Sequence, residues 1–592
     1  MLGHMRLIQI LVPMATVFFS LAALPQSQSP SSSLKALLDE EWDYEMRTGP
    51  ETATAYGDSR FNDRLSDFSP EFFASDVRQD QDFLAKFQAI PEAGLSEQEQ
   101  LNRSLMIRRL QGDIDGARFK PWEMQIDQFN GIHLSYGGLP SICPFATVRD
   151  YENYIARLHQ LPRVFDQVIA NSRQGMRDKL MPPKFLLEQV VPQARTVADD
   201  VSESNPFAQP IAKFPEGISA ADQARLRKEV MAAVKDDIAP AYAKFADFVQ
   251  KDYAPNGRTD VGVWALPDGA DRYRYNIRQL TTTDMTPEQI HELGLKQVAE
   301  IDAEMQAVAH KLGFKDVAAL NAHVRADHSL YASTSQQVLG LYQKYADQMY
   351  AKLPELFGTL PKNKLVVVPM ESFREKAGVP ADYSSGSPQT GRPGRINVNM
   401  YDPEHRLTLN IEAIAYHEGV PGHHLQISIG QEIPSLPAFR QHAEYTAFVE
   451  GWALYSERLG KEVGFYQDPY SDYGRLENEM WRAVRLVVDT GVHSKHWSRQ
   501  QMVDYFHQYT AMDEPNIQTE VDRYIAWPGQ ALAYKLGQLR ILEMRELAKK
   551  ELGAAFDIRA FHDEVLGASA LPLDVFEKRM VGWIATRKAS KQ

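Results

Sequence analysis

Apolar residues recur every three or four positions through most of this 592-residue chain, the spacing typical of amphipathic helices. The pattern is clearest over three segments, residues 145–173, 183–202 and 219–250. It returns at residue 410 and continues to the end of the chain. Thr286-Pro287-Glu288-Gln289 predicts a helix start with a capping box, and that helix runs to about Leu312. We therefore expect a mainly α-helical protein.

Four segments depart from the helical pattern. Lys364–Pro369 is short and apolar and predicts a buried strand, whereas Arg395–Tyr401 alternates polar and apolar residues and predicts a second strand. Ala381–Gly394 is rich in Gly, Ser and Pro and predicts a loop between them. In Asp260–Leu280 tyrosines alternate with polar residues, which indicates an extended segment. The expected fold is a large multi-helix body with a small β-sheet.

The first residues have the features of a signal peptide, which we assign to residues 1–24. Arg6 provides a positive start, Leu7–Leu24 is almost unbroken apolar sequence, and small residues precede a polar stretch. An uncleaved anchor is the alternative, because about 18 apolar residues approach the length of a membrane span. No Cys follows the apolar run, which argues against a lipid anchor. We expect a periplasmic or secreted protein that has no membrane contact after cleavage.

Composition narrows the choice of partners. The chain carries 64 Lys and Arg against 78 Asp and Glu, a formal net charge of −14, and has no strong basic run. Nucleic acid and anionic membranes are therefore excluded as expected partners. The single cysteine, Cys143, allows neither an intrachain disulfide nor a thiolate-rich zinc site. The sequence does not indicate an oligomeric state.

Two clusters of polar residues in the last third of the chain carry candidate chemistry. Residues 416–426 read Tyr-His-Glu-Gly-Val-Pro-Gly-His-His-Leu-Gln, and residues 447–457 read Ala-Phe-Val-Glu-Gly-Trp-Ala-Leu-Tyr-Ser-Glu. Two neutral imidazoles and one carboxylate can hold Zn²⁺ and leave a fourth position for water. Glu418, next to His417, is then placed to take a proton from that water. We therefore expect Zn²⁺ as the cofactor.

The spacing of the histidines requires a break in the helix. Zinc helices usually place their ligands at i and i+4, but here the next histidines after His417 are His423 and His424, at i+6 and i+7. Pro421 disrupts a helix, and the glycines on either side of it permit unusual dihedrals. A loop-out of two residues would bring His423 to the position of an i+4 ligand. We therefore favour His423, with His424 as the alternative ligand.

Two glutamates of the second cluster complete this hypothesis. Glu450 lies within an apolar stretch, and a buried carboxylate needs a cation or a proton, so we expect it to be the third ligand. Glu457 follows two helical turns later on the same face. It either orients a ligand histidine or is a plain surface charge.

Donors for an oxyanion are sought downstream of the metal motif. The candidates are His493, Arg523, Tyr524 and Tyr534. The two tyrosines are preferred because a phenol donates a hydrogen bond without carrying charge. Asn397 and Asn399 of the second strand could face a substrate peptide that is added to the sheet edge. Ordinary polar residues of an edge strand are the alternative interpretation.

The metal motif resembles that of the thimet oligopeptidase (neurolysin-like) metallopeptidases. The likeness comprises His-Glu, then Gly-His, then Phe-Val-Glu. It implies His417, His423 and Glu450 as zinc ligands and Glu418 as the catalytic base. The departure is two extra residues between His-Glu and Gly-His.

Over nearly the whole mature chain the sequence is similar to a bacterial family known as domain of unknown function 885. The matching motifs are Pro50-Glu51-x-Ala53-Thr54, Gly57-Asp58, Thr286-Pro287-Glu288-x-Ile290-His291, Gly391-Arg392-Pro393-Gly394, His-Glu-x-x-Pro-Gly-His-His, Glu450-Gly451-Trp452-Ala453, Arg485-Leu486-Val487-Val488-Asp489-Thr490-Gly491 and Trp527-Pro528-Gly529-Gln530-Ala531. The resemblance implies a zinc-peptidase-like fold.

We accordingly expect residues 34–592 to form one large helical metallopeptidase-like region, with the metal site within 395–535. A division into lobes at about 34–260 and 261–592 is the alternative. By analogy, a central channel would admit short peptides and exclude folded proteins. The predicted function is an exported zinc metallopeptidase. The alternatives are a zinc hydrolase of another amide or ester and a catalytically dead peptide-binding protein; the retention of Glu418 argues against the last.

Overall fold

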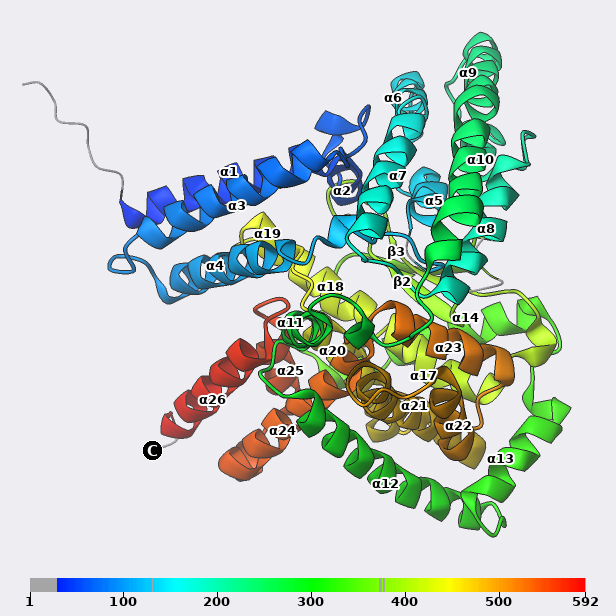
Figure 1. Ribbon diagram of the computed structural model, residues 1–592. Coiled ribbons are helices and arrows are strands. Elements are labelled where there is room, and N and C mark those ends of the chain that lie inside the picture. The colour runs from blue at the N-terminus through cyan, green and yellow to red at the C-terminus, as the bar shows by residue number, and fades with distance from the viewer. Residues whose placement is uncertain (1–28, 130, 372–374, 376–377, 591–592) are drawn as a thin grey trace, which may run out of the picture.

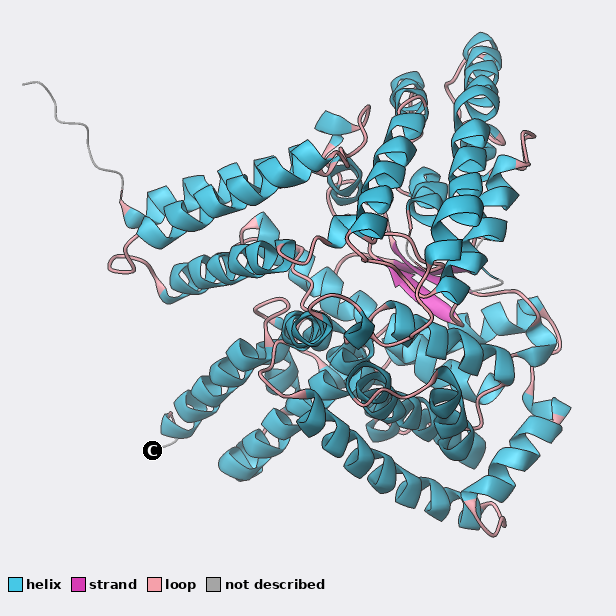
Figure 2. Cartoon of the chain, in the orientation of Figure 1, coloured by secondary structure: helices cyan, strands magenta, loops and turns pink. Residues whose placement is uncertain are grey.

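The computed structural model describes residues 29–129, 131–371, 375 and 378–590. The fold is mainly α-helical with one small sheet near its centre, as predicted (Figure 1, Figure 2). The predicted signal peptide, residues 1–24, lies outside the described residues. Within the described part of the chain, no helix is long and apolar enough to cross a membrane.

The first helices pack onto the C-terminal part of the chain rather than forming a separate unit. Their bounds are α1 Pro30–Thr48, α2 Pro50–Tyr56, α3 Pro70–Ala89 and α4 Glu97–Ala117. Apolar residues of α1, α3 and α4, such as Leu34, Phe87 and Met106, share one buried cluster with residues such as Trp452 and Phe576. This core therefore joins the ranges 34–260 and 261–592.

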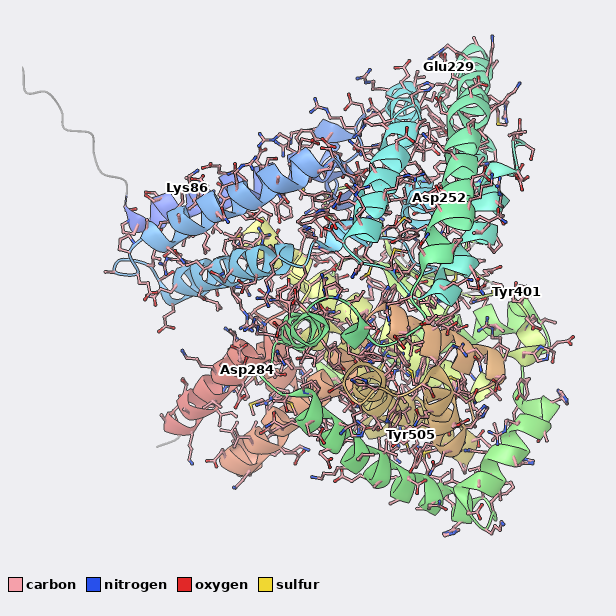
Figure 3. The ribbon with its side chains drawn as sticks, in the orientation of Figure 1. Lys86, Glu229, Asp252, Asp284, Tyr401 and Tyr505 are labelled. Atoms are coloured by element: carbon pink, nitrogen blue, oxygen red, sulfur yellow. The ribbon has the colours of Figure 1, made fainter. Side chains whose placement is uncertain are left out.

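The next helices form an arm with its own core, at the top of Figure 1. Their bounds are α5 Ile132–Ser135, α6 Val148–Leu158, α7 Leu161–Arg177, α8 Lys184–Ala198, α9 Ala220–Ala233 and α10 Ala239–Phe248. The helical prediction for 145–173, 183–202 and 219–250 is confirmed. Charged side chains such as Glu229 and Asp252 lie on the outer faces of this arm (Figure 3).

The rest of the chain surrounds one long buried helix, α21. The bounds are α11 Gly269–Thr281, α12 Pro287–Lys311, α13 Val317–Ala326, α14 Ser335–Tyr350, α15 Leu353–Leu356, α17 Ile411–Glu418, α18 His423–Gln431, α19 Ala438–Gln441, α20 Thr446–Glu462, α21 Pro469–Ser494, α22 Arg499–Tyr509, α23 Glu514–Ala526, α24 Ala533–Leu552, α25 Ile558–Leu566 and α26 Leu573–Ala589. The capping box of Thr286 and Gln289 starts α12, as predicted. Helix α12 packs along α21, and α24 packs along α20.

The extended segment predicted for Asp260–Leu280 is wrong. Residues 269–281 form α11, and its buried residues Tyr273, Ile277 and Thr281 recur at a spacing of four. The alternation of tyrosines with polar residues was misleading because only Tyr273 of the two tyrosines faces the core, whereas Tyr275 is half-buried. The helical period therefore decides the local structure.

The sheet has three strands in the order β1-β3-β2. Strand β1 (Leu365–Pro369) pairs in parallel with β3 (Gly394–Val398), and β2 (Ala381–Ser384) pairs antiparallel with β3. The positions of the predicted strands at 364–369 and 395–401 are thus confirmed in outline, but β1 is half-buried rather than buried, and Pro369 at its end is exposed. The loop predicted for 381–394 is wrong over its first four residues. Those residues form an edge strand, which leaves β3 as the central strand.

Candidate metal centre

A sharp turn separates the two histidine-bearing helices. Helix α17 ends at Glu418, and α18 begins at His423. A Cβ atom at Gly422 would lie 1.9 Å from the carbonyl oxygen of His417, so only glycine fits at this position. Trp452 Nε1 donates a hydrogen bond to the Pro421 carbonyl at 2.8 Å. The predicted break after the His-Glu pair is confirmed, and α20 holds it in place.

Three electron-pair donors converge at this break. His417 Nε2 and His423 Nε2 each lie 3.4 Å from Glu450 Oε2. One potential ligand atom from each residue lies within 4.8 Å of the others, and the two rings are almost perpendicular, at 88°. The two histidines are buried, and Glu450 is half-buried. The structure thus brings together the three residues that the sequence singled out as ligands, His417, His423 and Glu450, which we call the trio.

The chemistry of this trio fits a divalent metal ion. Glu450 Oε2 is buried without a hydrogen-bond partner in the described part of the chain, and a buried carboxylate oxygen is costly in that state. In a tetrahedral zinc site, neighbouring ligand atoms lie about 3.3 Å apart, close to the 3.4 Å between Glu450 Oε2 and each histidine Nε2. Burial opposes ionisation of Glu450, but the two imidazoles hold its pKa well below the usual range. Glu450 is therefore an anion ready to bind a cation.

Glu457 fixes the orientation of His417. Its Oε1 lies 2.9 Å from His417 Nδ1, and its side chain is about 1% exposed. Arg482 approaches the same carboxylate at 3.5 Å. Because Glu457 accepts the Nδ1 proton, the Nε2 lone pair is left to face Glu450. The interpretation of Glu457 as a plain surface charge is wrong.

His424 points away from the trio. Its Nε2 lies 3.2 Å from the Asn363 carbonyl, and its Nδ1 lies 3.1 Å from the Tyr383 hydroxyl. Both ring nitrogens are thus occupied. Burial lowers the pKa of His424 to about 4, so the ring is neutral. This geometry favours His423 over His424 as the ligand.

Glu418 lies at the end of α17 beside the trio. Burial raises its pKa to about 8, His423 opposes this rise, and the charges of Glu450 and Asp382 add to it. A carboxyl group with a raised pKa holds and releases protons near neutral pH. The carboxyl group that the sequence predicts to be the base is therefore harder to ionise than that of a free glutamate.

Tyr534 stacks against His417, with ring centroids 6.3 Å apart and planes inclined by 18°. Its hydroxyl accepts hydrogen bonds from Arg523 at 2.9 Å and from Gln530 at 3.3 Å. The hydroxyl proton makes no hydrogen bond to any described residue, so it can be donated to a ligand. Arg523 thus supports the tyrosine rather than facing the trio itself.

A close helix crossing places Tyr534 there. Gly451 of α20 lies against Gly537 of α24, and a Cβ atom at Gly537 would come within 1.7 Å of the Ala447 carbonyl oxygen. Two glycines therefore allow α24 to approach the helix that carries Glu450. Tyr534 lies almost one turn before Gly537, which brings its ring to His417.

The other two predicted donors are engaged elsewhere. The Tyr524 hydroxyl accepts from Trp481 and Arg485, both at 2.9 Å, and donates to Glu520. His493 Nδ1 accepts from the Val263 backbone at 3.0 Å, and its Nε2 lies 2.9 Å from the Tyr524 carbonyl. Neither side chain keeps a donor for a ligand. Their hydrogen bonds are structural.

The predicted substrate contacts of Asn397 and Asn399 are wrong. Both side chains are buried, and Asn397 Nδ2 donates to Asp382 at 2.7 Å and to Ser384 at 2.8 Å. Asn399 Nδ2 donates to three backbone carbonyls of residues 375, 378 and 379. These asparagines tie the central strand to its neighbours. A strand with partners on both sides cannot accept another strand.

The free edge beside the trio belongs to β2, which sequence reasoning missed. The ring of Tyr383 stacks on that of His423, with centroids 6.3 Å apart, and the charge of Asp382 acts on Glu418. The strand was hard to predict because it has only four residues and lies in a segment rich in Gly, Ser and Pro. The alternation of apolar and polar residues over Ala381–Ser384 was the one feature of the sequence that indicated a strand.

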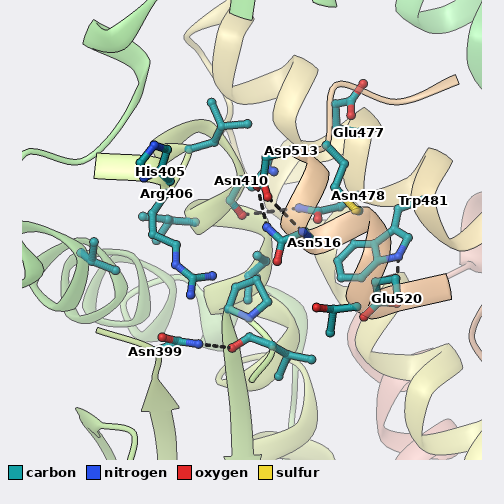
Figure 4. A pocket seen from close by; sticks show the side chains of 18 of the residues that line it. Asn399, His405, Arg406, Asn410, Glu477, Asn478, Trp481, Asp513, Asn516 and Glu520 are labelled. Carbon is teal, nitrogen blue, oxygen red and sulfur yellow. Dashed lines mark hydrogen bonds between the residues drawn. The ribbon is translucent and has the colours of Figure 1, made fainter. Parts of the chain in front are cut away.

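Two pockets open at the ends of this edge. One spans about 850 Å³, including the solvent at its mouth, and is lined by residues 378–380, just before β2, and by carboxamides including Asn410, Asn478 and Asn516 (Figure 4). The other spans about 310 Å³, again including solvent at its mouth, and its lining includes Ser385, just after β2. The edge strand therefore leads from one pocket, past the trio, to the other.

The sequence matches the family described as "Bacterial protein of unknown function (DUF885)" over residues 50–580. The chain belongs to this family. Its fold is similar to a solved structure titled "putative lipoprotein from Colwellia psychrerythraea", with a TM-score of 0.89 and 28% identity over 94% of this chain and 100% of the other. A second solved structure of similar fold is titled "a putative lipoprotein of unknown function from Shewanella oneidensis", with a TM-score of 0.69 and 18% identity over 94% of this chain and 100% of the other. None of the curated proteins matches this chain.

Proposed function

We propose that this DUF885 protein is a zinc-dependent metallopeptidase that hydrolyses short peptides. The proposal rests on the convergence of His417, His423 and Glu450. Oε2 of Glu450 is buried, lies between the two imidazoles and has no hydrogen-bond partner among the described residues. A bound Zn²⁺ would complete these interactions, polarise a peptide carbonyl and lower the pKa of a water molecule.

The surrounding residues have separate roles in this proposal. Glu418 takes a proton from the attacking water and delivers it to the leaving amine. Tyr534, whose hydroxyl is held by Arg523, donates a hydrogen bond to the oxygen of the tetrahedral intermediate. Glu457 keeps His417 in the tautomer that presents Nε2 to the site.

The edge of β2 supports a peptide as the substrate. An extended peptide can pair with a free strand edge through backbone hydrogen bonds. Four strand residues span about 13 Å, so the edge accommodates a segment of only a few residues. The pockets at its two ends then receive the flanking parts of the same short peptide.

We also propose export from the cytoplasm. The residues before Gln26 have the order of charged, apolar and small residues that a signal peptide requires. Two proteins of similar fold are titled as putative lipoproteins, which agrees with export for them. Fractionation of cells that express the full chain, with mass determination of the exported form, tests both export and cleavage.

The test of the proposed activity is a digest of a short-peptide library by purified protein with measured zinc content. We expect cleavage that a chelator removes and added Zn²⁺ restores. Glu418→Gln should bind zinc normally yet lose roughly 10²–10⁴-fold in kcat. Full turnover by zinc-loaded Glu418→Gln would eliminate the base, and cleavage of esters but no peptides would redirect the proposal to another hydrolase.

A further inference from the structure

The smaller pocket lies along the same helix as one proposed metal ligand. Gln426, Ile427 and Gln431 line the pocket, and they follow His423 on α18 at i+3, i+4 and i+8, a spacing that shares one helix face. Gln426 is displaced from His423 by about 4.5 Å along the helix axis. The pocket therefore begins at a distance from the trio that one or two residues of an extended peptide would span, and it continues away from the trio.

Two buried amide groups in this pocket lack partners. Gln426 is about 2% exposed and Gln431 about 6% exposed, and Oε1 of each is buried without a hydrogen bond. Neither side chain forms any hydrogen bond within the described residues. Unsatisfied buried acceptors are rare because each costs about 1–3 kcal/mol. Two of them lining one pocket point to a ligand that donates hydrogen bonds.

The pocket also carries an acidic side chain, that of Glu444. Glu444 is accessible to solvent and forms no ion pair with any described Lys or Arg. Burial raises the pKa of the Glu444 carboxyl, His423 of the nearby trio opposes this rise, and Glu450 adds to it, so a cation bound beside Glu444 would favour its ionised form. Tyr56, also in the lining, stacks on His442 at 3.8 Å and experiences the charges of Glu444 and Glu45. The surroundings favour a cation.

We propose that this pocket binds the protonated amino terminus of the substrate, so that cleavage releases a short amino-terminal fragment. An ammonium group has three donors, which match the carboxylate of Glu444 and the amide oxygens of Gln426 and Gln431. The orientation agrees with the sheet: a peptide antiparallel to β2 has its amino end beside Ser385, where this pocket opens. The inference rests on the proposed peptidase function.

Binding tests this inference without turnover. Tetra-alanine amide and its N-acetylated form are titrated into the Glu418→Gln protein by calorimetry. Loss of a charged hydrogen-bonding group should weaken the acetylated peptide roughly tenfold or more. Glu444→Gln in the same background should bring the affinity ratio of the two peptides close to one. Glu444→Asp, which keeps the charge, should retain a preference for the free amine.

Turnover provides the second measurement. The wild-type protein should cleave free peptides with kcat/KM roughly tenfold or more above that for acetylated peptides, and mass spectrometry should identify short amino-terminal products. Equal binding and cleavage of both peptides, or tight binding of acetylated peptides that contain Lys, would overturn the inference while leaving the peptidase proposal intact. If no peptide is cleaved but the free amine is still preferred in binding, the pocket assignment stands and the proposed activity fails.

Discussion

The carboxylate of Glu457 lies 2.9 Å from Nδ1 of His417, and both side chains are buried. Glu457 follows Glu450 by two turns of α20, so one helix supplies both the proposed ligand and the group that orients another ligand. A carboxylate behind a metal-binding histidine raises the basicity of the imidazole and fixes its ring. The hydrogen bond between Glu457 and His417 therefore supports a metal-binding role for the histidine, because two helices can pack together without such a buried polar pair.

We predict that Glu457→Gln weakens zinc binding by roughly 10–100-fold without unfolding the protein. The amide keeps the shape of the side chain but removes its charge and weakens its hold on the His417 ring. Competition with a chromogenic zinc chelator measures the affinity, and circular dichroism checks the fold. Glu71→Gln on the exposed start of α3 is the control and should leave affinity unchanged. Wild-type affinity in Glu457→Gln would contradict the orienting role.

Tyr534 and Tyr524 provide a matched pair. Tyr534→Phe removes the one hydroxyl beside His417 whose proton has no acceptor among the described residues, so we expect kcat to fall roughly 10²–10³-fold with little change in KM. The comparison requires steady-state kinetics on one peptide under zinc saturation. A loss confined to KM would indicate that Tyr534 binds the ground state only.

Tyr524→Phe should behave in the opposite way. It removes an acceptor from Trp481 and Arg485 and a donor to Glu520, all within the buried interior. We expect a stability loss of about 1–3 kcal/mol in denaturant unfolding and a kcat close to that of the wild type. A large fall in kcat without a loss of stability would show instead that the Tyr524 hydroxyl takes part in catalysis.

The sequence was sufficient to predict most of the helices and the trio because these depend on local patterns, whereas α11 was predicted as an extended segment. Pro421 lacks an amide proton and clashes with the preceding helical turn, and Gly422 permits the dihedrals of a break. A carboxylate among apolar residues at Glu450 indicated burial with a cation or a proton. Zinc itself stays a prediction, as do the catalytic roles and the central channel.

The features that the sequence did not predict depend on contacts between distant segments. Strand order decides whether Asn397 faces solvent or β2, and no pattern within residues 395–401 encodes that order. Spacing placed Glu457 on the face of Glu450 but could not distinguish burial from exposure. Whether Tyr524 or Tyr534 lies beside the trio likewise depends on how α20 and α24 cross. Gly451 and Gly537 allow that close crossing.

Gly537→Ala tests that crossing directly. The added Cβ atom would meet the Ala447 carbonyl oxygen, so α24 must move away from α20 or the backbone must shift. We expect a stability loss of about 1–3 kcal/mol or more, together with lower kcat because Tyr534 moves with α24. Denaturant unfolding and kinetics on the zinc-loaded protein measure the two effects. Gly582→Ala on α26, where an added Cβ atom meets nothing within 4 Å, is the control. Equal stability of both variants would contradict the tight crossing.

Asp489 should make stability depend on pH. Its carboxylate accepts from the Tyr273 hydroxyl at 2.5 Å and from the Gly529 backbone at 3.1 Å, yet burial raises its pKa to about 7. In the unfolded chain the pKa of Asp is near 3.9, so between about pH 4 and 7 the folded state holds the extra proton. Stability contributed by that proton is present below pH 4 and is lost toward pH 7, at up to about 1.4 kcal/mol per pH unit. Asp489→Asn should remove this contribution from denaturant unfolding curves recorded across that range. An unchanged slope in the variant would show that Asp489 is ionised in the folded protein.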